Sequence, residues 1–192
     1  MAAKFLIGVD EAGRGPLAGP VAVGVVKVAT NFDIRAAFPG VNDSKQISES
    51  LRETIYKEME TRAKAGEISF CVRFAAASTI DRVGITKAVK RSVWSGVRSL
   101  APDAAVTKVL LDGLLQAPDE YEQETIIKGD ALLPVISLAS IAAKVRRDRL
   151  MKRLALAYPE YLFEVHKGYG TKKHYEALKK WGPSDIHRLS FL

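Results

Sequence analysis

The sequence predicts an α/β fold in which helices pack on one sheet of mixed direction. Three runs rich in β-branched residues lie within the first 74 residues, and helical and strand patterns alternate after them. The first two runs are joined by too short a connection for a helical crossover, so these strands should pair antiparallel. With 47% hydrophobic residues, the 192-residue chain has enough apolar mass for one domain spanning residues 1–192.

The strand segments are short apolar or alternating runs that turn residues bound. Residues 5–9 form a continuous apolar run, and residues 21–28 are rich in valine and glycine, which disfavour helix. Residues 68–74 alternate between apolar and other side chains. Two further strands are expected, over residues 107–111 and 125–128.

Helices are predicted from polar caps followed by apolar residues at helical spacing. The first begins near Ser48 or Ser50, with Ser50-x-x-Glu53 as a capping box, and ends at Gly66. Further helices are expected over residues 78–100, 135–157 and 171–181. The last of these lies in a small helical region near the end of the sequence.

Positive charge is concentrated in the last third of the sequence. The net charge is +7, and residues 129–192 hold 12 Lys and Arg against 6 Asp and Glu, whereas residues 1–128 hold 17 against 16. A concentrated basic region favours a polyanionic partner such as nucleic acid, because neutralised phosphates release counterions. A solvated, solubilising surface is the alternative interpretation.

The remaining composition indicates a cytoplasmic protein that does not enter a membrane. No run approaches 18 apolar residues, and the first residues lack the apolar region and cleavage site of a secretory signal. The single cysteine, Cys71, cannot form an internal disulfide and fits a reducing compartment. Nothing in the sequence requires more than a monomer.

Three predicted strands end in acidic residues, at Asp10-Glu11, Asp112 and Asp130. If these strands are neighbours with a shared direction, the carboxylates converge at one edge of the sheet. Each pair about 4 Å apart would repel by roughly 4 kcal/mol at an effective dielectric of about 20. Hard oxygen ligands of this kind select Mg²⁺ or Mn²⁺. Two such ions about 4 Å apart can activate a water and stabilise the leaving oxygen in phosphoryl transfer.

The adjacent pair Asp10-Glu11 presents a geometric difficulty. Neighbouring residues of a regular strand point to opposite faces, so the strand should break between them if both reach one site. Gly13 and Gly15 lie close enough to allow such a break. The alternative is that the acids end strands simply as turn formers.

Other chemistries are disfavoured. Zinc sites need clustered ligands, and one cysteine with His166, His174 and His187 shows no ligand spacing. Gly13-x-Gly15-x-x-Ala18 matches a dinucleotide-binding fingerprint, but a strand rather than a helix is expected after it. A nucleotide-using phosphotransferase is disfavoured because the sequence has no Gly-x-x-x-x-Gly-Lys-Ser/Thr loop.

Seven sequence blocks in order resemble the bacterial ribonuclease HII family, over essentially the whole chain. The blocks are residues 8–16 (GVDEAGRGP), 42–45 (NDSK), 111–113 (LDG), 127–130 (IKGD), 140–148 (SIAAKVRRD), 166–171 (HKGYGT), and 182–184 (GPS) with 187–188 (HR). The resemblance implies a ribonuclease H-like fold with a five-stranded mixed sheet flanked by helices. It also implies a hydrolase, a metal-dependent endonuclease that cuts the RNA strand of RNA–DNA hybrids.

The resemblance further implies cleavage on the 5′ side of ribonucleotides embedded in DNA, leaving 3′-hydroxyl and 5′-phosphate ends. The natural task would be ribonucleotide excision and removal of RNA primers during DNA replication. The four catalytic and metal-binding acids of the family fall on Asp10, Glu11, Asp112 and Asp130, the set already reached from the strand ends.

In the family a Gly-Arg-Gly turn and a tyrosine read the RNA–DNA junction, which implies Gly13, Arg14, Gly15 and Tyr169 here. The 2′-hydroxyl is the group that separates RNA from DNA, and glycine amides can approach it closely. Tyr169 can stack on the sugar that follows. Without the resemblance these would be ordinary turn and loop residues.

Several polar residues flank the family blocks as candidate phosphate contacts: Ser44, Lys45, Lys144, Lys167, Lys172 and Lys173. Ser44 either binds phosphate or caps a turn. Lys144 either faces phosphate or pairs with Asp148, which we interpret as a structural acid outside the catalytic set. The rival function is a non-catalytic nucleic-acid-binding module, which explains the basic region but not the acids.

Overall fold

The structure, a computed structural model, describes residues 3–41 and 47–192 and contains one five-stranded sheet. The strands are β1 (Phe5–Ala12), β2 (Val21–Ala29), β3 (Ile68–Ala75), β4 (Thr107–Asp112) and β5 (Glu122–Ile126). Their order across the sheet is β3-β2-β1-β4-β5. The first three pair antiparallel, and β1, β4 and β5 run parallel, which confirms the mixed sheet and the antiparallel first pair.

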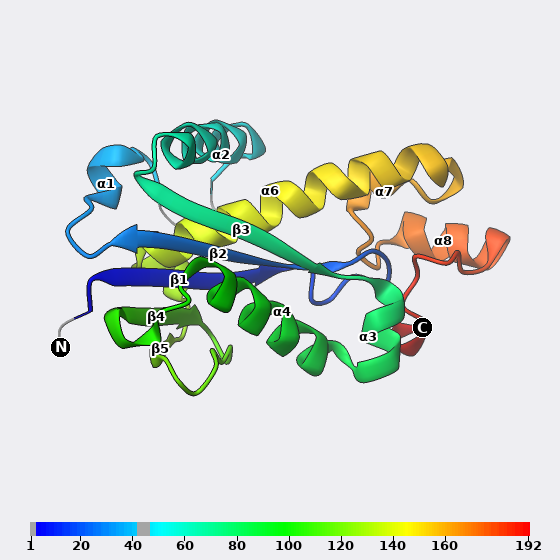
Figure 1. Ribbon diagram of the computed structural model, residues 1–192. Coiled ribbons are helices and arrows are strands. Elements are labelled where there is room, and N and C mark those ends of the chain that lie inside the picture. The colour runs from blue at the N-terminus through cyan, green and yellow to red at the C-terminus, as the bar shows by residue number, and fades with distance from the viewer. Residues whose placement is uncertain (1–2, 42–46) are drawn as a thin grey trace.

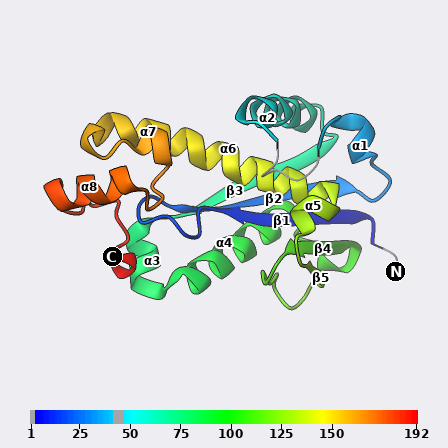
Figure 2. The same ribbon diagram turned by 180° about the vertical axis from the view of Figure 1, so that it is seen from behind.

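Helices cover both faces of the sheet (Figures 1 and 2). One face carries α1 (Ile34–Ala37), α2 (Glu49–Lys64) and α6 (Pro134–Ala157), and the other carries α3 (Ala77–Val83) and α4 (Ile85–Leu100). The shorter segments are α5 (Gly129–Leu132), α7 (Phe163–His166), α8 (Lys172–Trp181), η1 (Ala104–Val106), η2 (Pro159–Tyr161) and η3 (Leu189–Phe191). Within the described residues, no helix is both long and apolar enough to cross a membrane.

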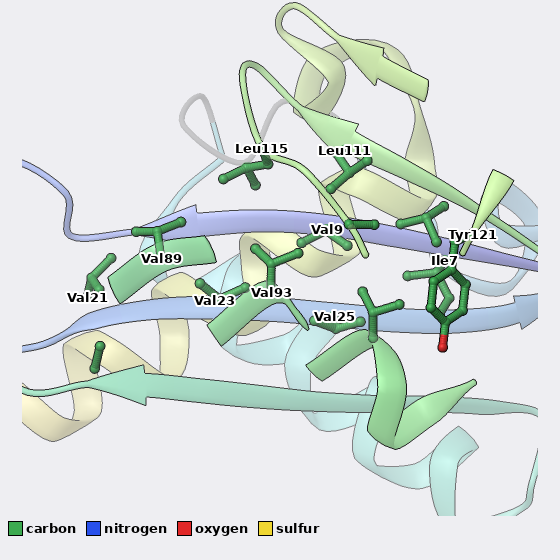
Figure 3. Packing of buried hydrophobic residues seen from close by; sticks show 14 of the residues in the cluster. Ile7, Val9, Val21, Val23, Val25, Val89, Val93, Leu111, Leu115 and Tyr121 are labelled. Carbon is green, nitrogen blue, oxygen red and sulfur yellow. The ribbon is translucent and has the colours of Figure 1, made fainter. Parts of the chain in front are cut away.

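The central strands are apolar on both sides because each side faces a separate core. Between the sheet and α4, side chains such as Val9 and Val23 pack against Val93 and its neighbours (Figure 3). On the opposite face Val26 and Val28 pack in a cluster with α2 and α6. A strand buried on both faces reads as an unbroken apolar run, which is why the sequence identifies β1 and β2.

Two helix predictions need correction. Ser48, not Ser50, caps α2, because its hydroxyl oxygen accepts the Leu51 amide at 3.2 Å, and Ser50 lies inside the helix. The helix expected over residues 78–100 is two helices, because Gly84 separates α3 from α4 with φ 81° and ψ 151°. Glycine adopts this positive φ without steric cost, and the chain changes direction there.

The last strand lies earlier than predicted, at Glu122–Ile126 rather than residues 125–128. It is an edge strand whose side chains are polar and largely exposed, so it lacks the apolar pattern that marks a buried strand. Lys128 then takes a left-handed conformation with φ 58° and starts α5. Asp130 is therefore in the first turn of a short helix and not at a strand end.

Helix α6 crosses the sheet in unusually close contact with β1 and β2. A side-chain carbon at Gly8 would overlap the backbone carbonyl of Val135, and one at Gly24 would overlap the carbonyl of Ala139. The neighbours are backbone atoms of a helix, which cannot move aside as a flexible side chain can. These two glycines therefore set the distance between α6 and the sheet.

We predict that Gly24→Ala destabilises the fold by about 1–3 kcal/mol or more, because the methyl group forces α6 away from β2. Denaturant unfolding measures the change. The matched control is Gly15→Ala, since nothing in the described part of the chain lies within 4 Å of a side-chain carbon there, and its stability should match the wild type. Equal stability of all three proteins would contradict the close crossing.

Candidate active site

Three segments meet at one edge of the sheet, beyond the carboxyl ends of β1 and β4. The ladder between these strands ends at the pair Val9 and Leu111, so Asp10 and Asp112 follow it directly. An Asp112 carboxylate oxygen accepts the Gly129 amide at 2.6 Å, which ties the start of α5 to the same edge. The neighbouring Asp130 is buried, with 2% of its surface exposed.

Asp10 is a buried carboxylate that faces α6. Only 4% of its surface is exposed, its Oδ1 accepts the Glu11 amide at 2.7 Å, and the Ser140 side chain of α6 hydrogen-bonds to it. The pKa of Asp10 is raised from 3.8 to about 8, chiefly by burial and also by the nearby charges of Glu11 and Asp112, while the Ser140 hydrogen bond lowers it. Ionising Asp10 is therefore costly unless a cation compensates.

The expected strand break between Asp10 and Glu11 is absent. Strand β1 stays paired with β2 as far as Ala12, opposite Ala22, yet Glu11 lines a cleft together with Ser140, the α6 residue that hydrogen-bonds to Asp10. The backbone keeps its hydrogen bonds to β2, and the glycine turn begins only after Ala12. Burial raises the pKa of Glu11, and the guanidinium of Arg14, whose Nη1 lies 3.3 Å from Oε1, opposes this shift.

The acids form an electrostatically coupled group rather than a completed metal cage. Asp10, Glu11 and Asp112 interact through their charges. Across residues 3–41 and 47–192, however, no three acidic, histidine or cysteine side chains stand close enough to hold a metal ion as they are. Glu11 pairs with Arg14 at 3.3 Å, and the side chain of Glu11 is 17% exposed whereas that of Arg14 is 47% exposed. The oxygen-rich set fits a hard divalent cation.

The turn that follows β1 and the loop that carries Tyr169 line one cleft with Glu11. Its volume is about 560 Å³. The lining residues are Glu11, Ala12, Gly13, Arg14, Gly15, Arg52, Ser140, Lys144 and Tyr169. The structure thus brings the implied reading residues of the turn and Tyr169 together with one acid, although more than 150 residues separate them in sequence. Arg52 and Ser140 also line the cleft and were not among the predicted site residues.

The buried side chain of Arg147, on α6, lies against the backbone of the Gly13–Gly15 turn. The side chain is 1% exposed and donates to the carbonyl oxygens of Pro20 at 2.9 Å, Lys167 at 3.0 Å and Ala18 at 3.3 Å. A side-chain carbon at Gly13 would overlap this guanidinium, so only glycine fits there. Arg147 therefore joins the segment after β1 to the loop before Tyr169.

Arg188, near the end of the chain, holds the same turn from the other side. It is fully buried and donates to the carbonyl oxygens of Gly13 at 2.7 Å, Arg14 at 2.8 Å and Gly19 at 2.9 Å. Burial lowers its pKa to about 10. The carboxylate of Asp81 accepts the amides of the two residues that follow Arg188, each at 3.0 Å, which anchors the tail to α3.

Of the expected phosphate contacts, Lys144 is the best placed. It pairs with Asp148 at 3.0 Å, as one of the two alternatives predicted, and it also lines the cleft. The ammonium of Lys167 donates to the carbonyl of Glu164, and its backbone is left-handed with φ 52°. Ser44 and Lys45 lie outside the described residues.

Much of the positive charge in residues 129–192 has a partner within the protein. Besides the two buried arginines, Arg149 pairs with Glu53 of α2 at 2.5 Å and Lys152 pairs with Glu49 at 2.6 Å. Lys172 lies 3.9 Å from a carboxylate oxygen of Glu176, and its side chain is 91% exposed. The net charge of this region therefore overstates the charge that faces solvent.

The comparisons with known proteins identify the family of the chain. The sequence model of the family described as Ribonuclease HII matches residues 7–192. The chain belongs to the ribonuclease HII family. One relative, Ribonuclease HII from Bacillus cytotoxicus, is 43% identical over 188 residues, which are 98% of this chain and 68% of the relative.

Solved structures give the same fold. Ribonuclease H2 from Pyrococcus horikoshii has a TM-score of 0.76 at 26% identity, covering 97% of this chain and 93% of that one. Bst-RNase HIII, solved in complex with Mn²⁺, has a TM-score of 0.73 at 19% identity over 99% of this chain and 68% of that one. The ribonuclease H-like fold is therefore confirmed. As a ribonuclease HII, the chain is a hydrolase, an endoribonuclease of RNA–DNA hybrids.

Four residues that support the site were not found from the sequence: Ser140, Arg52, Arg147 and Arg188. Ser140, Arg147 and Arg188 lie within the blocks that resemble the family, so the sequence marked them as part of a family motif. Such a block does not show whether an arginine is buried or on the surface. Arg52 lies outside the blocks, and only its helix α2 brings it to the cleft.

We predict that Asp10→Asn stabilises the metal-free protein increasingly as pH rises. In the wild type the folded pKa, about 8, exceeds the ordinary value of 3.8, so the stability present at acidic pH is lost as pH rises towards 8. At roughly 1.4 kcal/mol per pKa unit, the gain of the variant should reach the order of a few kcal/mol by pH 8.

Thermal unfolding in chelator from pH 5 to pH 8 measures this gain. Asp103→Asn is the matched control, because Asp103 caps η1 through its carboxylate oxygen and asparagine caps equally well. A gain for Asp10→Asn that stays flat or shrinks with rising pH would contradict the buried, destabilised carboxylate.

Proposed function

We propose that the protein is a divalent-metal-dependent endonuclease that cuts on the 5′ side of ribonucleotides, both in RNA–DNA hybrids and embedded in DNA. The products would carry 3′-hydroxyl and 5′-phosphate ends. The observation that carries the proposal is the meeting of Asp10, Glu11 and Asp112 at one sheet edge, next to the cleft of the Gly13–Gly15 turn and Tyr169.

The four acids Asp10, Glu11, Asp112 and Asp130 would hold Mg²⁺ or Mn²⁺. Bound divalent ions would supply the charge that activates water and stabilises the leaving oxygen of the phosphodiester. The raised pKa of Asp10 supports this role, because a cation is what would let that buried carboxylate ionise at neutral pH. Ser140 would orient Asp10 through its hydrogen bond.

Gly13, Arg14 and Gly15 would select the ribonucleotide together with Tyr169, which lines the same cleft. Gly15 supports this role because, among residues 3–41 and 47–192, no atom beyond its chain neighbours lies within 4 Å of the place a side-chain carbon would take. A backbone without a side chain there lets a 2′-hydroxyl approach the amides closely. The ring of Tyr169, which is 43% exposed, is available to stack on a sugar.

Phosphate contacts would come from Lys144 at the cleft and from exposed lysines of α8 such as Lys172 and Lys173. The substrates would be RNA–DNA hybrids and DNA with embedded ribonucleotides, bound by a cytoplasmic monomer. The cellular task would be excision of such ribonucleotides and removal of RNA primers. Each of these assignments follows from the proposed chemistry and the membership of the family.

We predict that DNA duplex containing one ribonucleotide is cut with Mg²⁺ or Mn²⁺ and stays intact in chelator, because the acids need a cation to act. Gel analysis of end-labelled strands would locate the cut 5′ to the ribonucleotide. Asp10→Asn should lower cleavage by at least about 100-fold, the scale of one catalytic group, while duplex binding stays near the wild-type level.

Asp103→Asn is again the control and should cut as the wild type does. Retarded migration without cleavage under every metal condition would support a binding module and contradict the nuclease. Cleavage that survives Asp10→Asn would refute the metal assignment instead.

We also predict that Gly15→Ala folds normally but loses cleavage of the single-ribonucleotide substrate, because its methyl group meets only the bound nucleic acid. Unfolding curves and cleavage rates, measured on the same preparation, separate the two effects. Wild-type rates for this variant would refute the role of the turn in selection.

A further inference from the structure

Three buried histidines lie directly behind the loop that carries Tyr169. His174 and His187 are almost completely buried, and His166 is 7% exposed. The rings of His166 and His174 stack at 4.5 Å between centroids, and His187 lies 5.2 Å from His174. The spacing of the three residues in the sequence fits no ligand motif, so this cluster was not predicted.

The hydrogen bonds of His187 fix where its proton lies. The Ser184 amide lies 2.9 Å from Nδ1 of His187, and an amide nitrogen can only donate, so Nδ1 is an acceptor without a proton. In a neutral ring the proton is then on Nε2. That atom lies 3.0 Å from Nε2 of His174.

The hydrogen bonds of His174 also indicate that His187 is the donor and His174 the acceptor. Nδ1 of His174 lies 3.0 Å from the carbonyl oxygen of Tyr169, which can only accept, so Nδ1 carries the proton of His174. Its Nε2 is then the acceptor for His187. The chain of hydrogen bonds therefore runs from Ser184 through His187 and His174 to Tyr169, with one proton on each ring.

The ring nitrogens of His166 are also engaged. Nδ1 accepts the Gly168 amide at 3.2 Å, and Nε2 faces the carbonyl of Tyr161 at 2.7 Å, to which it donates. Burial lowers the pKa of all three histidines, that of His187 to about 4, so the neutral forms persist at physiological pH. Because these nitrogens are committed to hydrogen bonds, the cluster is not a vacant metal site.

The backbone of Tyr169 is held on both sides by this arrangement. Its amide donates to the His166 carbonyl at 2.9 Å, and its carbonyl accepts from the Thr171 amide at 2.8 Å as well as from His174. The exposed ring rests over the guanidinium of Arg147 at 5.8 Å. The ring is 43% exposed, so the hydrogen bonds of its backbone and the contact with Arg147 together set its direction.

We propose that His174 is a positioning residue for Tyr169, and that His187 holds it in the tautomer with the proton on Nδ1. The pair would fix the tyrosine ring at the cleft, opposite the Gly13–Gly15 turn. This inference rests on the proposed role of Tyr169 in substrate selection. It concerns orientation alone, since neither histidine lines the cleft.

The tautomers are measurable without activity, by ¹⁵N–¹H correlation spectra of the histidine side chains in the intact protein. His174 should carry its proton on Nδ1, and both His166 and His187 should carry theirs on Nε2. A proton on Nε2 of His174 would overturn the inference. This measurement uses the wild type, so it decides the question even if a variant fails to fold.

Two matched variants test the function of the hydrogen bond from His174 to the Tyr169 carbonyl oxygen. The amide nitrogen of asparagine replaces Nδ1, so His174→Asn can still donate to the Tyr169 carbonyl. The amide of glutamine replaces Nε2, so His174→Gln keeps a contact with His187 but loses the donor to Tyr169. Both remove one imidazole from the same buried place, and melting curves verify that their stabilities match.

With the single-ribonucleotide duplex, His174→Asn should keep kcat/KM within about threefold of the wild type. His174→Gln should lose about tenfold, the fold-change of one lost hydrogen bond. Equal values for the two variants, beside a clear loss for Tyr169→Ala, would overturn the positioning inference alone. Wild-type cleavage by Tyr169→Ala would instead overturn the selecting role of the tyrosine on which the inference rests.

Discussion

The close crossing of α6 over β1 and β2 is the constraint on which the site depends. Because Gly8 and Gly24 have no side chains, the helix lies against the strand backbones. The same helix then brings Ser140 to Asp10, and Lys144 to the cleft. One turn further, Arg147 reaches beneath the Gly13 backbone. A more distant helix would separate the acids from the turn that lies beside them.

Two buried arginines hold the turn in place through hydrogen bonds to backbone carbonyl oxygens. Arg147 and Arg188 each donate to three carbonyl oxygens, so oriented carbonyl dipoles help to compensate their charges. Burying a charge is expensive unless its hydrogen bonds are satisfied, and the planar guanidinium satisfies several at once. The carbonyls of the turn therefore point inward to the arginines. This arrangement joins the start of the chain, α6 and the C-terminal tail into one support.

The sequence was sufficient to predict the elements whose burial leaves a pattern. Strands β1 and β2 are continuous apolar runs because both faces are covered, and α6 is long enough to be recognised. The edge strand β5 was predicted at the wrong residues because its exposed side chains form no apolar pattern. The helix break at Gly84 was not predicted because the pattern of apolar residues does not reveal a positive φ. The predicted strand break between Asp10 and Glu11 was also wrong, because β1 stays paired with β2 as far as Ala12.

The candidate site shows the same division between local and long-range information. The acids at strand ends could be inferred from the residues, and the reading turn and Tyr169 from the family resemblance. The residues that hold the turn and Tyr169 in place could not be predicted. Arg188 contacts Gly13 across 175 residues of sequence, and His187 contacts His174 because the chain folds back after α8. Hydrogen-bond direction in the histidine cluster depends on coordinates and has no sequence pattern at all.

The most direct test of the central claim is a crystal structure with Mn²⁺ and a non-cleavable hybrid, using the anomalous signal of the metal. Anomalous density within coordination distance of the carboxylates of Asp10 and Asp112, with Glu11 turned away from Arg14, is the predicted result. Density confined to another part of the molecule, with Glu11 still paired to Arg14, would contradict the claim that these acids hold the catalytic metal.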